Sequence, residues 1–523
     1  MSEGLRTLPI GIQSFESLRQ RAYLYVDKTA RLQKLITEGE RYFLSRPRRF
    51  GKSLTLSTLD AMFSGKAELF EGLAAEAWVT EQARHPSPVL RIDMSTMDVR
   101  DVARFEKNLV AELTERSRKH GIMLTRSDSD EPGGAFKGMI EGLYDRSGPV
   151  IVLIDEYDKP ILDKIGDLEA AEAMRGALRS FYTVLKGCDE YLRFVMLTGI
   201  SRFSKTGVFS AMNNLVDISM DEGYGDVVGY TQAELEDNFS GWLDVTAGKL
   251  SVARDELLKR MKDYYDGFCF DGKIRLYNPF STLSFFFAGE FKNYWYHSGS
   301  PRFILAYMRS HGIDDPEAYR HRCVPADFAD SQEIERARPE SFLYQAGYLT
   351  IEEKCENQIL TLDYPNEEVR SALTRLYLDQ VYRIDGYLTL GAKLWEALSR
   401  GRLDEVILLY NTALSGIPYQ DFRTQNESLY RSLFLMLLRG AGVVAHGEVP
   451  TNRGRSDVLV LFPSRAVVLE FKLAQGAGEI AGLREEGKKQ IEEKGYAKPY
   501  DEEGRAVTSA VIVIDAEKHE AGL

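Results

Sequence analysis

Apolar runs alternate with amphipathic segments through the N-terminal part of the chain. Four mostly apolar runs are predicted to be strands, at 41–44, 88–94, 149–154 and 191–198, and the run 149–154 has the continuous apolar character of a strand buried on both faces of a parallel sheet. Between them, 54–63 and 103–119 repeat apolar residues at helical spacing. This alternation predicts an α/β domain built around a parallel sheet. We also expect a strand at 22–26, followed by a helix that Asp27 caps.

The pattern changes near residue 230, where helical spacing predominates. Thr231 and Glu234 have the spacing of a capping box, so a helix is predicted to begin there. Further on, a helix that ends at Gly347 and two strands, 348–351 and 358–363, give a winged-helix outline. Such a unit binds DNA in some proteins and covers an ATPase as a lid in others. Its acidic neighbours favour the lid.

The C-terminal segment shows a third pattern. An amphipathic helix is predicted first, then a strand, a hairpin, a further helix and a last strand, at 422–439, 443–449, 454–473, 490–496 and 506–515. We therefore predict three domains. These are an α/β domain with a parallel sheet at 1–230, a mostly helical, winged-helix-like region at 231–415, and a second α/β domain at 416–523.

Composition narrows the class of protein. The 523 residues are 44% hydrophobic, which is enough for several cores, and the net charge of −13 argues against a basic coat for nucleic acid. A local basic strip beside a metal site is compatible with that charge. The four cysteines lie far apart, which suits a reducing cytoplasm rather than a zinc ribbon or a disulfide framework. Neither a bilayer-spanning apolar run nor an apolar signal region is visible, so we expect a cytoplasmic protein without a membrane partner.

A segment rich in basic residues lies between a predicted strand and a predicted helix, which is the layout of a phosphate-binding P-loop. Backbone N–H groups at such a helix start point towards an anion. Lys52 would meet the β- and γ-phosphates of ATP, and the hydroxyl of Ser53 would bind Mg²⁺. The expected ATP-binding residues of this segment are Arg46, Pro47, Arg48, Arg49, Phe50, Gly51, Lys52, Ser53 and Leu54.

The segment departs from the general P-loop pattern at its start. Arg46 stands where that pattern has its first glycine, and a Cβ there narrows the conformations open to the loop. Pro47 also fixes φ and removes one N–H. By itself, the segment leaves open a basic turn between a strand and a helix that binds no ligand.

Paired carboxylates follow the apolar run 149–154, as at the end of a buried strand in an active site. In this Walker B pattern, Asp155 would hold Mg²⁺ and Glu156 would orient or deprotonate the attacking water. Carboxylates after a strand also cap helices, but that alternative weakens when a Gly-Lys-Ser loop lies upstream. Asp158 has no predicted role.

The strand 191–198 ends in a polar residue, Thr198, which is the candidate sensor of the γ-phosphate in the ATP-binding set. Arg202 belongs to the same set with two interpretations of equal weight. It contacts the γ-phosphate, in its own chain or in a neighbour's, or it forms a cap or an ion pair at the surface.

Together, 25–29, 46–53, 153–158 and 198–203 resemble the AAA-ATPase-like family found in bacteria, whose members often carry a restriction-nuclease-like tail. Arg-Pro-Arg-Arg-Phe-Gly-Lys-Ser is the usual P-loop of that family, so the resemblance makes Arg46 ordinary. It covers the first predicted domain and continues more weakly to the end of the chain. It implies a P-loop fold that binds ATP and Mg²⁺.

A second set of charged residues lies on the C-terminal hairpin. Asp457, Glu470 and Lys472 fit the pattern D-x12-E-x-K. Glu470 and Lys472 are two apart on a strand and face the same side, whereas Phe471 faces the core. Asp457 lies on the adjacent strand, so that Asp457 and Glu470 could share one Mg²⁺ while Lys472 lies beside the attacking water. Glu427, on the preceding helix, would complete the metal shell.

This pattern resembles the PD-(D/E)xK nuclease superfamily, with Ser456 in place of the usual proline. The pattern is weak by itself. However, its Glu and Lys lie in an apolar run, where uncompensated charges are costly, and the order of predicted elements matches the nuclease core. Gln490 and Tyr496 resemble a helix motif of RecB-like nucleases and are expected to contact DNA or the site.

The sequence therefore predicts an ATP-binding and ATP-hydrolysing protein coupled to Mg²⁺-dependent cleavage of nucleic acid, with DNA as the favoured partner. The main alternative is a nucleotide-controlled switch whose nuclease-like domain binds DNA or a protein partner without cutting. A structural protein with both sites decayed ranks last, because each motif position holds a competent residue type. Monomer and homo-oligomer both remain open.

Overall fold

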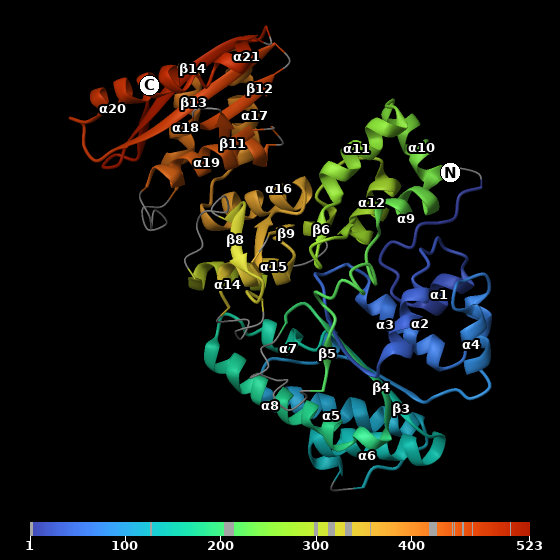
Figure 1. Ribbon diagram of the computed structural model, residues 1–523. Helices are drawn as coiled ribbons and strands as arrows, with labels where there is room; N and C mark the ends of the chain where they lie inside the picture. The colour runs from blue at the N-terminus through green and yellow to red at the C-terminus, as the bar shows by residue number, and fades with distance from the viewer. Residues whose placement is uncertain are drawn as a thin grey trace. The chain divides into compact units, whose positions relative to one another are not determined.

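Figure 1 shows the computed structural model, in which the chain divides into two compact units. Unit 1 comprises Met1–His311 and His321–Val369, and unit 2 comprises Gly312–Arg320 and Arg370–Leu523. The structure describes residues 4–125, 128–202, 214–297, 302–311, 319–329, 337–355, 357–417, 426–441, 443, 445–451, 454–462, 464–502 and 504–523. Each unit is described by itself.

The N-terminal part of unit 1 is built on a parallel sheet. Its strands follow the order β2 (Val89–Asp93), β3 (Val150–Asp155), β4 (Leu192–Gly199), β1 (Arg41–Ser45) and β5 (Val216–Asp217). Every residue of β3 is buried, as expected for a strand covered on both faces. The predicted α/β class with a parallel sheet is confirmed. Since β4 lies between β1 and β3, the carboxyl ends of these three strands meet at one edge of the sheet.

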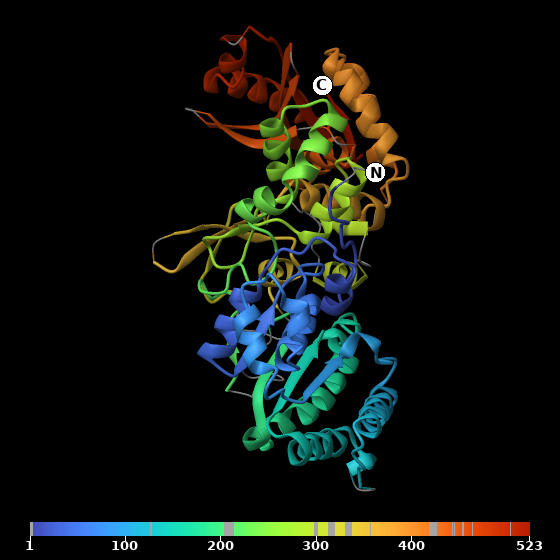
Figure 2. The ribbon, with the colours of Figure 1, turned by 90° about the vertical axis from the view of Figure 1, so that its right-hand side faces the viewer.

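Helices cover both faces of this sheet. They are α1 (Phe15–Gln20), α2 (Thr29–Glu38), α3 (Lys52–Phe63), α4 (Glu76–Gln82), α5 (Val102–Lys119), α6 (Pro132–Ser147), α7 (Lys159–Leu162) and α8 (Leu168–Gly187). Helix α3 packs on β2, β3 and β4, and α6 packs on β3. The two ribbon views agree that α1–α3 lie on one side of the sheet and α5 and α6 on the other (Figures 1 and 2).

The strand expected at 22–26 is wrong. Residues 23–28 run irregularly into α2, and the N–H groups of Tyr23 and Leu24 donate to the carbonyls of Leu18 and Thr7. Asp27 nevertheless supports the helix start, because its carboxylate accepts from both the N–H (2.8 Å) and the hydroxyl (2.7 Å) of Thr29. Apolar residues predicted burial here, but the neighbouring strand that would have paired with them is missing from the described chain.

The rest of unit 1 is mostly helical. Its helices are α9 (Gln232–Asn238), α10 (Ser240–Leu250), α11 (Arg254–Tyr265), α12 (Pro279–Ala288), α13 (Tyr294–His297), α14 (Arg302–His311) and α15 (Pro339–Ala346), and its short strands β6 (Phe268–Cys269) and β7 (Arg275–Leu276) pair with each other. The predicted capping box is present at Thr231 and Glu234. Helix α15 ends at Gly347, which has φ +86°, and an antiparallel sheet β8-β10-β9 (Arg322–Pro325, Ile359–Asp363, Thr350–Lys354) lies beside it in the chain. This agrees with the winged-helix-like outline.

Unit 2 contains a mixed sheet with helices around it. Its helices are α16 (Glu367–Leu376, which begins in unit 1), a π-helical turn (Tyr377–Val381), α17 (Tyr387–Ser399), α18 (Leu403–Ser415), α19 (Glu427–Gly440), α20 (Ile480–Lys494) and α21 (Lys498–Glu502). The strands follow the order β11 (Ala445–Thr451), β12 (Gly454–Phe462), β13 (Arg465–Ala474), β14 (Ala506–Asp515) and β15 (Glu520–Gly522), and β13 and β14 are parallel. The predicted elements of this segment are present, but the helix predicted at 490–496 is α20, which begins earlier, at Ile480, and ends at Lys494. The first residues of the helix predicted at 422–439 lie outside the described chain, and β15 had no counterpart in the prediction.

The boundary between the two units falls inside α16, between Val369 and Arg370. The predicted division into 1–230, 231–415 and 416–523 remains a prediction. Across the part of the chain that is described, none of the helices has both the length and the apolar character that crossing a bilayer requires.

Candidate functional site

The loop between β1 and α3 has the backbone of an anion-binding turn. Helix α3 begins at Lys52, and the first rung of its ladder is the bond from the N–H of Thr55 to the carbonyl of Gly51 (2.9 Å). The N–H groups of the first helical turn therefore lie outside the helical ladder and face the loop. Gly51 has φ +94°, a left-handed conformation that favours glycine, which explains its place before Lys52.

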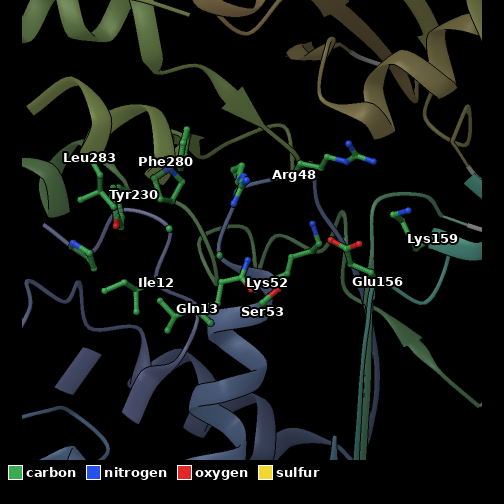
Figure 3. Close-up of a pocket in the computed structure, with 16 residues that line it drawn as sticks. Ile12, Gln13, Arg48, Lys52, Ser53, Glu156, Lys159, Tyr230, Phe280 and Leu283 are labelled. Carbon is green, nitrogen blue, oxygen red and sulfur yellow. The ribbon is translucent and has the colours of Figure 1, made fainter. Parts of the chain in front are cut away.

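A cavity of about 420 Å³ opens in front of this turn. Figure 3 shows that it has two ends. Ile12, Gln13, Tyr230, Phe280 and Leu283 line a largely apolar end, and Arg48, Lys52, Glu156 and Lys159 line a charged one. The volume is in the range of small-molecule sites. Of the predicted ATP-binding and catalytic residues, the cavity is lined by Arg48, Arg49, Gly51, Lys52, Ser53, Leu54 and Glu156.

Lys52 is buried at the charged end and is held by the loop itself. Its Nζ donates to the carbonyls of Arg46 (2.8 Å) and Pro47 (3.0 Å), and the residue is 6% exposed. Burial lowers the pKa of the amine, while the carboxylates of Glu156 and Asp155 act in the opposite direction. The side chains of Lys52 and Glu156 face each other across the cavity (Figure 3).

The carboxylates of Asp155, at the end of β3, and of Glu156, the next residue, have different surroundings. The Oδ1 atom of Asp155 accepts from the hydroxyl of Thr198 at 2.8 Å, which joins the Walker B strand to the predicted sensor. Glu156 has φ +48°, a strained conformation for a residue with a side chain, and such strain is concentrated at functional sites. Burial raises the pKa of Glu156, and the Lys52 cation opposes that rise.

Asp158, which had no predicted role, is a buried anchor for the loop after β4. Its Oδ2 atom accepts from the N–H of Ile200 (2.9 Å) and from the N–H and hydroxyl of Ser201 (both 2.6 Å). Burial raises its pKa, and these three donors act against that rise. Asp158 therefore ties the Walker B segment to the strand that carries Thr198.

The side chain of Arg46 lies outside the cavity, although Arg46 was predicted to bind ATP. It is 1% exposed, donates to the carbonyls of Ser45 (2.9 Å) and Ser219 (2.6 Å), and stacks 4.4 Å from the ring of Phe270. Its backbone carbonyl still contacts Lys52. The residue that replaces glycine thus holds the P-loop from behind rather than touching the ligand space.

A covering segment, which we define as the described residues 268–297 and 337–348 of unit 1, holds the rest of the P-loop in the same way. The ring of Phe50 packs edge-on against Phe268 (4.8 Å between centroids), and the indole N–H of Trp295 donates to the carbonyl of Arg48 (3.1 Å). A Cβ on Gly347 would come within 2.6 Å of Pro47, so this glycine permits the close approach. Phe50 and Pro47 therefore shape the loop without lining the cavity.

Arg202 is paired in this structure. Its Nε donates to Asp217 (2.7 Å), and its backbone N–H donates to the side chain of Gln345 (2.8 Å). Both interpretations of Arg202 remain predictions. A cation that the sequence argument missed lies nearer the Walker B carboxylate: Arg91 on β2 is 4.0 Å from Asp155 and donates to the carbonyl of Ser53 (3.2 Å). A charged residue inside an apolar strand was the signal available for Arg91.

The C-terminal constellation is assembled by β12, β13, α19 and α20 of unit 2. Asp457 on β12 accepts from the backbone N–H of Phe471 on β13 (2.8 Å), which brings it beside Glu470. Lys472 donates to Glu470 (3.1 Å) and to the side-chain carbonyl of Gln490 (3.0 Å). The amide of Gln490 is in turn 3.5 Å from the hydroxyl of Tyr496. The residues predicted for metal, catalysis and nucleic acid are thus linked side by side.

The charges in this cluster fit a divalent cation. Glu470 is 1% exposed, and burial, followed by the charge of Asp457, raises its pKa to about 7. Its Oε2 atom is buried and has no hydrogen-bond partner among the described residues. Burial also raises the pKa of Glu427, which the Lys472 cation opposes. Oxygen ligands of this kind suit Mg²⁺, and an orphaned buried carboxylate oxygen beside other carboxylates is where a cation relieves the cost of burial.

Phe471 and Lys472 take the orientations predicted from the strand. Phe471 is fully buried and packs against Phe434. Burial lowers the pKa of Lys472, but the nearby carboxylates, with Glu470 first and then Glu427 and Asp457, together outweigh it and the net shift is upwards. Arg431, another residue that the sequence argument missed, donates to Asp457 at 2.9 Å. It lies four residues after Glu427 on an amphipathic helix, a spacing that places the two on one face.

Comparison with known proteins gives two family matches. A family described as a predicted AAA-ATPase matches residues 9–209, and the PD-(D/E)XK nuclease superfamily matches residues 425–521. Over 512 residues the chain is 34% identical to the "Uncharacterized protein in vnfD 5'region" of Azotobacter chroococcum mcd 1. That alignment covers 96% of this chain and 95% of the relative.

Two solved structures are also similar. One is Cdc6p from Pyrobaculum aerophilum, with a TM-score of 0.28 and 11% identity over 70% of this chain and 98% of that chain. The other is the Aeropyrum pernix Orc1 protein in complex with DNA, with a TM-score of 0.25 and 12% identity over 82% of this chain and 88% of that chain. Both scores are low, so the fold assignment rests on the sheet order and on the family matches.

Proposed function

The chain belongs to the AAA-ATPase-like family and ends in a domain of the PD-(D/E)XK nuclease superfamily, and from that premise we propose that it hydrolyses ATP and cleaves a phosphodiester bond of DNA. One observation carries the ATPase half. Lys52 and Glu156 face each other at the charged end of a cavity whose other end is apolar. That is the polarity of a nucleotide, with its phosphates at the helix start and its base among Ile12, Tyr230 and Phe280.

The roles at this site follow from the contacts. Lys52 exchanges its two carbonyl partners for the β- and γ-phosphates, which are stronger acceptors because they are charged. Ser53 and Asp155 would hold Mg²⁺, which neutralises charge on the phosphate oxygens when bound. Glu156 orients and deprotonates the attacking water. Thr198, through its hydrogen bond to Asp155, reports on the γ-phosphate position.

ATP hydrolysis by wild type, Glu156→Gln and Lys52→Ala tests this half. Glu156→Gln keeps the shape of the side chain but removes the base, so we expect ATP binding to persist and turnover to fall about a hundredfold or more. Lys52→Ala is expected to lose binding as well. Lys34→Ala, on the surface of α2, serves as the control and should match wild type. Equal turnover by all four proteins would contradict the proposal.

The nuclease half rests on a group of neighbouring residues connected by hydrogen bonds. Its members are Asp457, Glu470, Lys472, Gln490 and Tyr496. Glu427, Asp457 and Glu470 would hold Mg²⁺, which supplies an activated water and neutralises charge on the phosphate. Lys472 is a protonated amine held between Glu470 and Gln490, so it positions the water or steadies the phosphate rather than acting as a base. Gln490 and Tyr496 would contact the nucleic acid.

Cleavage of supercoiled plasmid and of a single-stranded oligonucleotide, with Mg²⁺ and with or without ATP, tests this half. We expect cleavage by wild type and by Lys489→Gln, an exposed lysine of α20, and loss of cleavage in Glu470→Gln and Lys472→Met. Cleavage that survives both site variants would overturn the assignment. DNA binding that depends on ATP without any cleavage would instead support the nucleotide-controlled switch.

A further inference from the structure

Arg431 forms an ion pair with the carboxylate of Asp457, which is one of the groups that would bind the proposed metal. Helix α19 presents Glu427 and Arg431 one turn apart, and the Nη1 atom of Arg431 lies 2.9 Å from Oδ1 of Asp457. The side chain is 15% exposed, so this is a largely buried ion pair. The second oxygen of Asp457 accepts from the N–H of Phe471. Both oxygens of Asp457 are therefore engaged by donors of the chain itself.

The charges of the cluster form two pairs with one carboxylate left over. Arg431 holds Asp457, and Lys472 holds Glu470 through Oε1. Glu427, one turn before Arg431 at the start of α19, adds a third carboxylate on the same face of that helix. A buried carboxylate without a cation is costly, so Arg431 stabilises the cluster when no divalent ion is bound. The same guanidinium repels a divalent ion at a few ångströms.

We propose, on the basis of the nuclease function proposed above, that Arg431 is a built-in counter-ion which a divalent metal must displace from Asp457, and that the displaced guanidinium then binds a phosphate of the nucleic acid. Arg431 is thus a positioning residue that binds first the carboxylate of Asp457 and then a phosphate of the nucleic acid. The N–H of Phe471 does not interfere, because each carboxylate oxygen has two lone pairs and accepts a second partner.

Two consequences follow from this exchange. Removal of the guanidinium removes a competitor, so metal binding becomes tighter. Phosphate is the other natural partner of a planar guanidinium, and its oxygens accept two parallel hydrogen bonds from the guanidinium N–H groups. Nucleic acid that captures Arg431 therefore frees Asp457, and metal and nucleic acid bind cooperatively. By linkage, each tightens the other by the same factor.

Calorimetric titration with Mn²⁺ tests the exchange on the full-length protein. We expect Arg431→Gln to bind Mn²⁺ at least tenfold more tightly than wild type, with Lys489→Gln unchanged. A short DNA duplex is expected to tighten Mn²⁺ binding by wild type about tenfold and to leave Arg431→Gln unaffected. The duplex measurements are made in the Lys472→Met background, so that no cleavage occurs during the titration.

Arg431→Met provides a second variant, since it keeps the aliphatic stem if glutamine disturbs packing, and circular dichroism establishes that each variant is folded. If both folded variants bind Mn²⁺ with an affinity equal to or weaker than that of wild type, the proposed role of Arg431 is overturned, whereas the metal site itself is not. Coupling to DNA that persists in both variants does the same. Failure of every protein, wild type included, to bind Mn²⁺ overturns the metal site and with it the nuclease proposal. Glu470→Gln distinguishes this site from the one proposed at Ser53 and Asp155, because it should abolish only the heat that comes from this site.

Discussion

Asp158 shows how a single buried carboxylate organises the proposed ATP site without lining its cavity. Three donors from Ile200 and Ser201 converge on one of its oxygens. Hydrogen bonds to a charged acceptor are about twice as strong as neutral ones, so the loop after β4 is held firmly. Gly199, just before that loop, allows the approach, since a Cβ there would lie 2.4 Å from the ring of Tyr157.

We predict that Asp158→Ala lowers the free energy of unfolding by about 3 kcal/mol, because it leaves three donors buried without an acceptor. ATP turnover should fall more than ATP affinity does, since Thr198 rather than the P-loop loses its support. Urea unfolding and a steady-state ATPase assay measure the two effects. Asp163→Ala removes an exposed carboxylate that pairs with Lys159 and should leave both quantities near wild type.

Arg46 and Arg49 lie in the same loop, but the side chain of Arg46 is anchored whereas the backbone of Arg49 is strained. Arg46 is anchored by Ser45, Ser219 and Phe270, and burial lowers its pKa to about 10, so it remains charged at neutral pH. Arg49 has φ +67°, a conformation that a residue with a Cβ adopts only with strain. The same substitution therefore has a different sign at the two positions.

Arg46→Gly is expected to destabilise the protein by about 2 kcal/mol, because the packing on Phe270 is lost and the loop gains conformational freedom. Arg49→Gly is expected to be neutral or to stabilise by up to about 1 kcal/mol, because it relieves the left-handed strain. Urea unfolding of the two variants gives the comparison. If both variants lost the same free energy of unfolding, the contacts of the Arg46 side chain would contribute nothing to stability.

At the scale of elements, helix α16 begins with a buried carboxyl that supports the segment over the P-loop. Oε1 of Glu368 accepts from the backbone N–H of Trp295 (2.8 Å), and the indole of Trp295 donates to the carbonyl of Arg48 in the P-loop. Burial raises the pKa of Glu368 to about 8. Helix α16, α13 and the P-loop are therefore connected by two hydrogen bonds within unit 1.

This carboxyl gives a pH dependence with a definite sign. Between the ordinary carboxyl pKa of 4.5 and the folded-state pKa of about 8, Glu368 is protonated in the folded protein and ionised in the unfolded chain. The folded state then binds one proton more, so the contribution is fully present below pH 4.5 and is lost as pH rises towards 8. The slope from this one group is at most about 1.4 kcal/mol per pH unit.

We predict that Glu368→Gln removes this slope from the stability of wild type. Urea unfolding at several pH values between 5 and 8, compared for the two proteins, measures the difference. Glutamine keeps the acceptor for Trp295, so the variant should remain folded. Parallel stability profiles for the two proteins would show that Glu368 ionises in the folded state as easily as in the unfolded chain.

At the scale of the whole molecule, each unit contains its own core and its own proposed ligand site. The cavity in front of Lys52 is lined by unit 1 residues, whereas Glu470 and its neighbours lie in unit 2. A cluster of Leu459, Val468, Ile491 and other apolar residues packs between the sheet and α20 in unit 2. Binding to one unit stabilises the elements that form its site.

Hydrogen exchange measured by mass spectrometry tests this separation. We expect ATP to slow exchange in β1, the start of α3 and the covering segment, and Mn²⁺ to slow exchange in β12, β13 and α19. Lys52→Ala should remove the first effect and Glu470→Gln the second. A ligand at 100 times its dissociation constant stabilises its site by about 2.7 kcal/mol, which is large enough to detect. If ATP slowed exchange in the unit 2 peptides and Mn²⁺ slowed exchange in the unit 1 peptides, the two-site proposal would be contradicted.

Local pattern was enough for the main features of both units. The parallel sheet, the capping box at Thr231 and the hairpin with Asp457 and Glu470 follow from periodicity and from spacing along the chain, which are properties of short segments. The strand expected at 22–26 failed because pairing needs a neighbour, and no periodicity in the segment itself reveals whether one is present.

What the chain order alone could not decide is which residues from distant segments meet. Arg46 stands in the P-loop by sequence, yet its side chain packs on Phe270, 224 positions later by their numbers. Asp158 finds its donors on the loop after β4, and Arg431 finds Asp457 across from its helix. Motifs and elements are encoded locally, whereas the partners of a buried charge are selected by packing, since only the folded chain removes water and makes each unpaired charge costly.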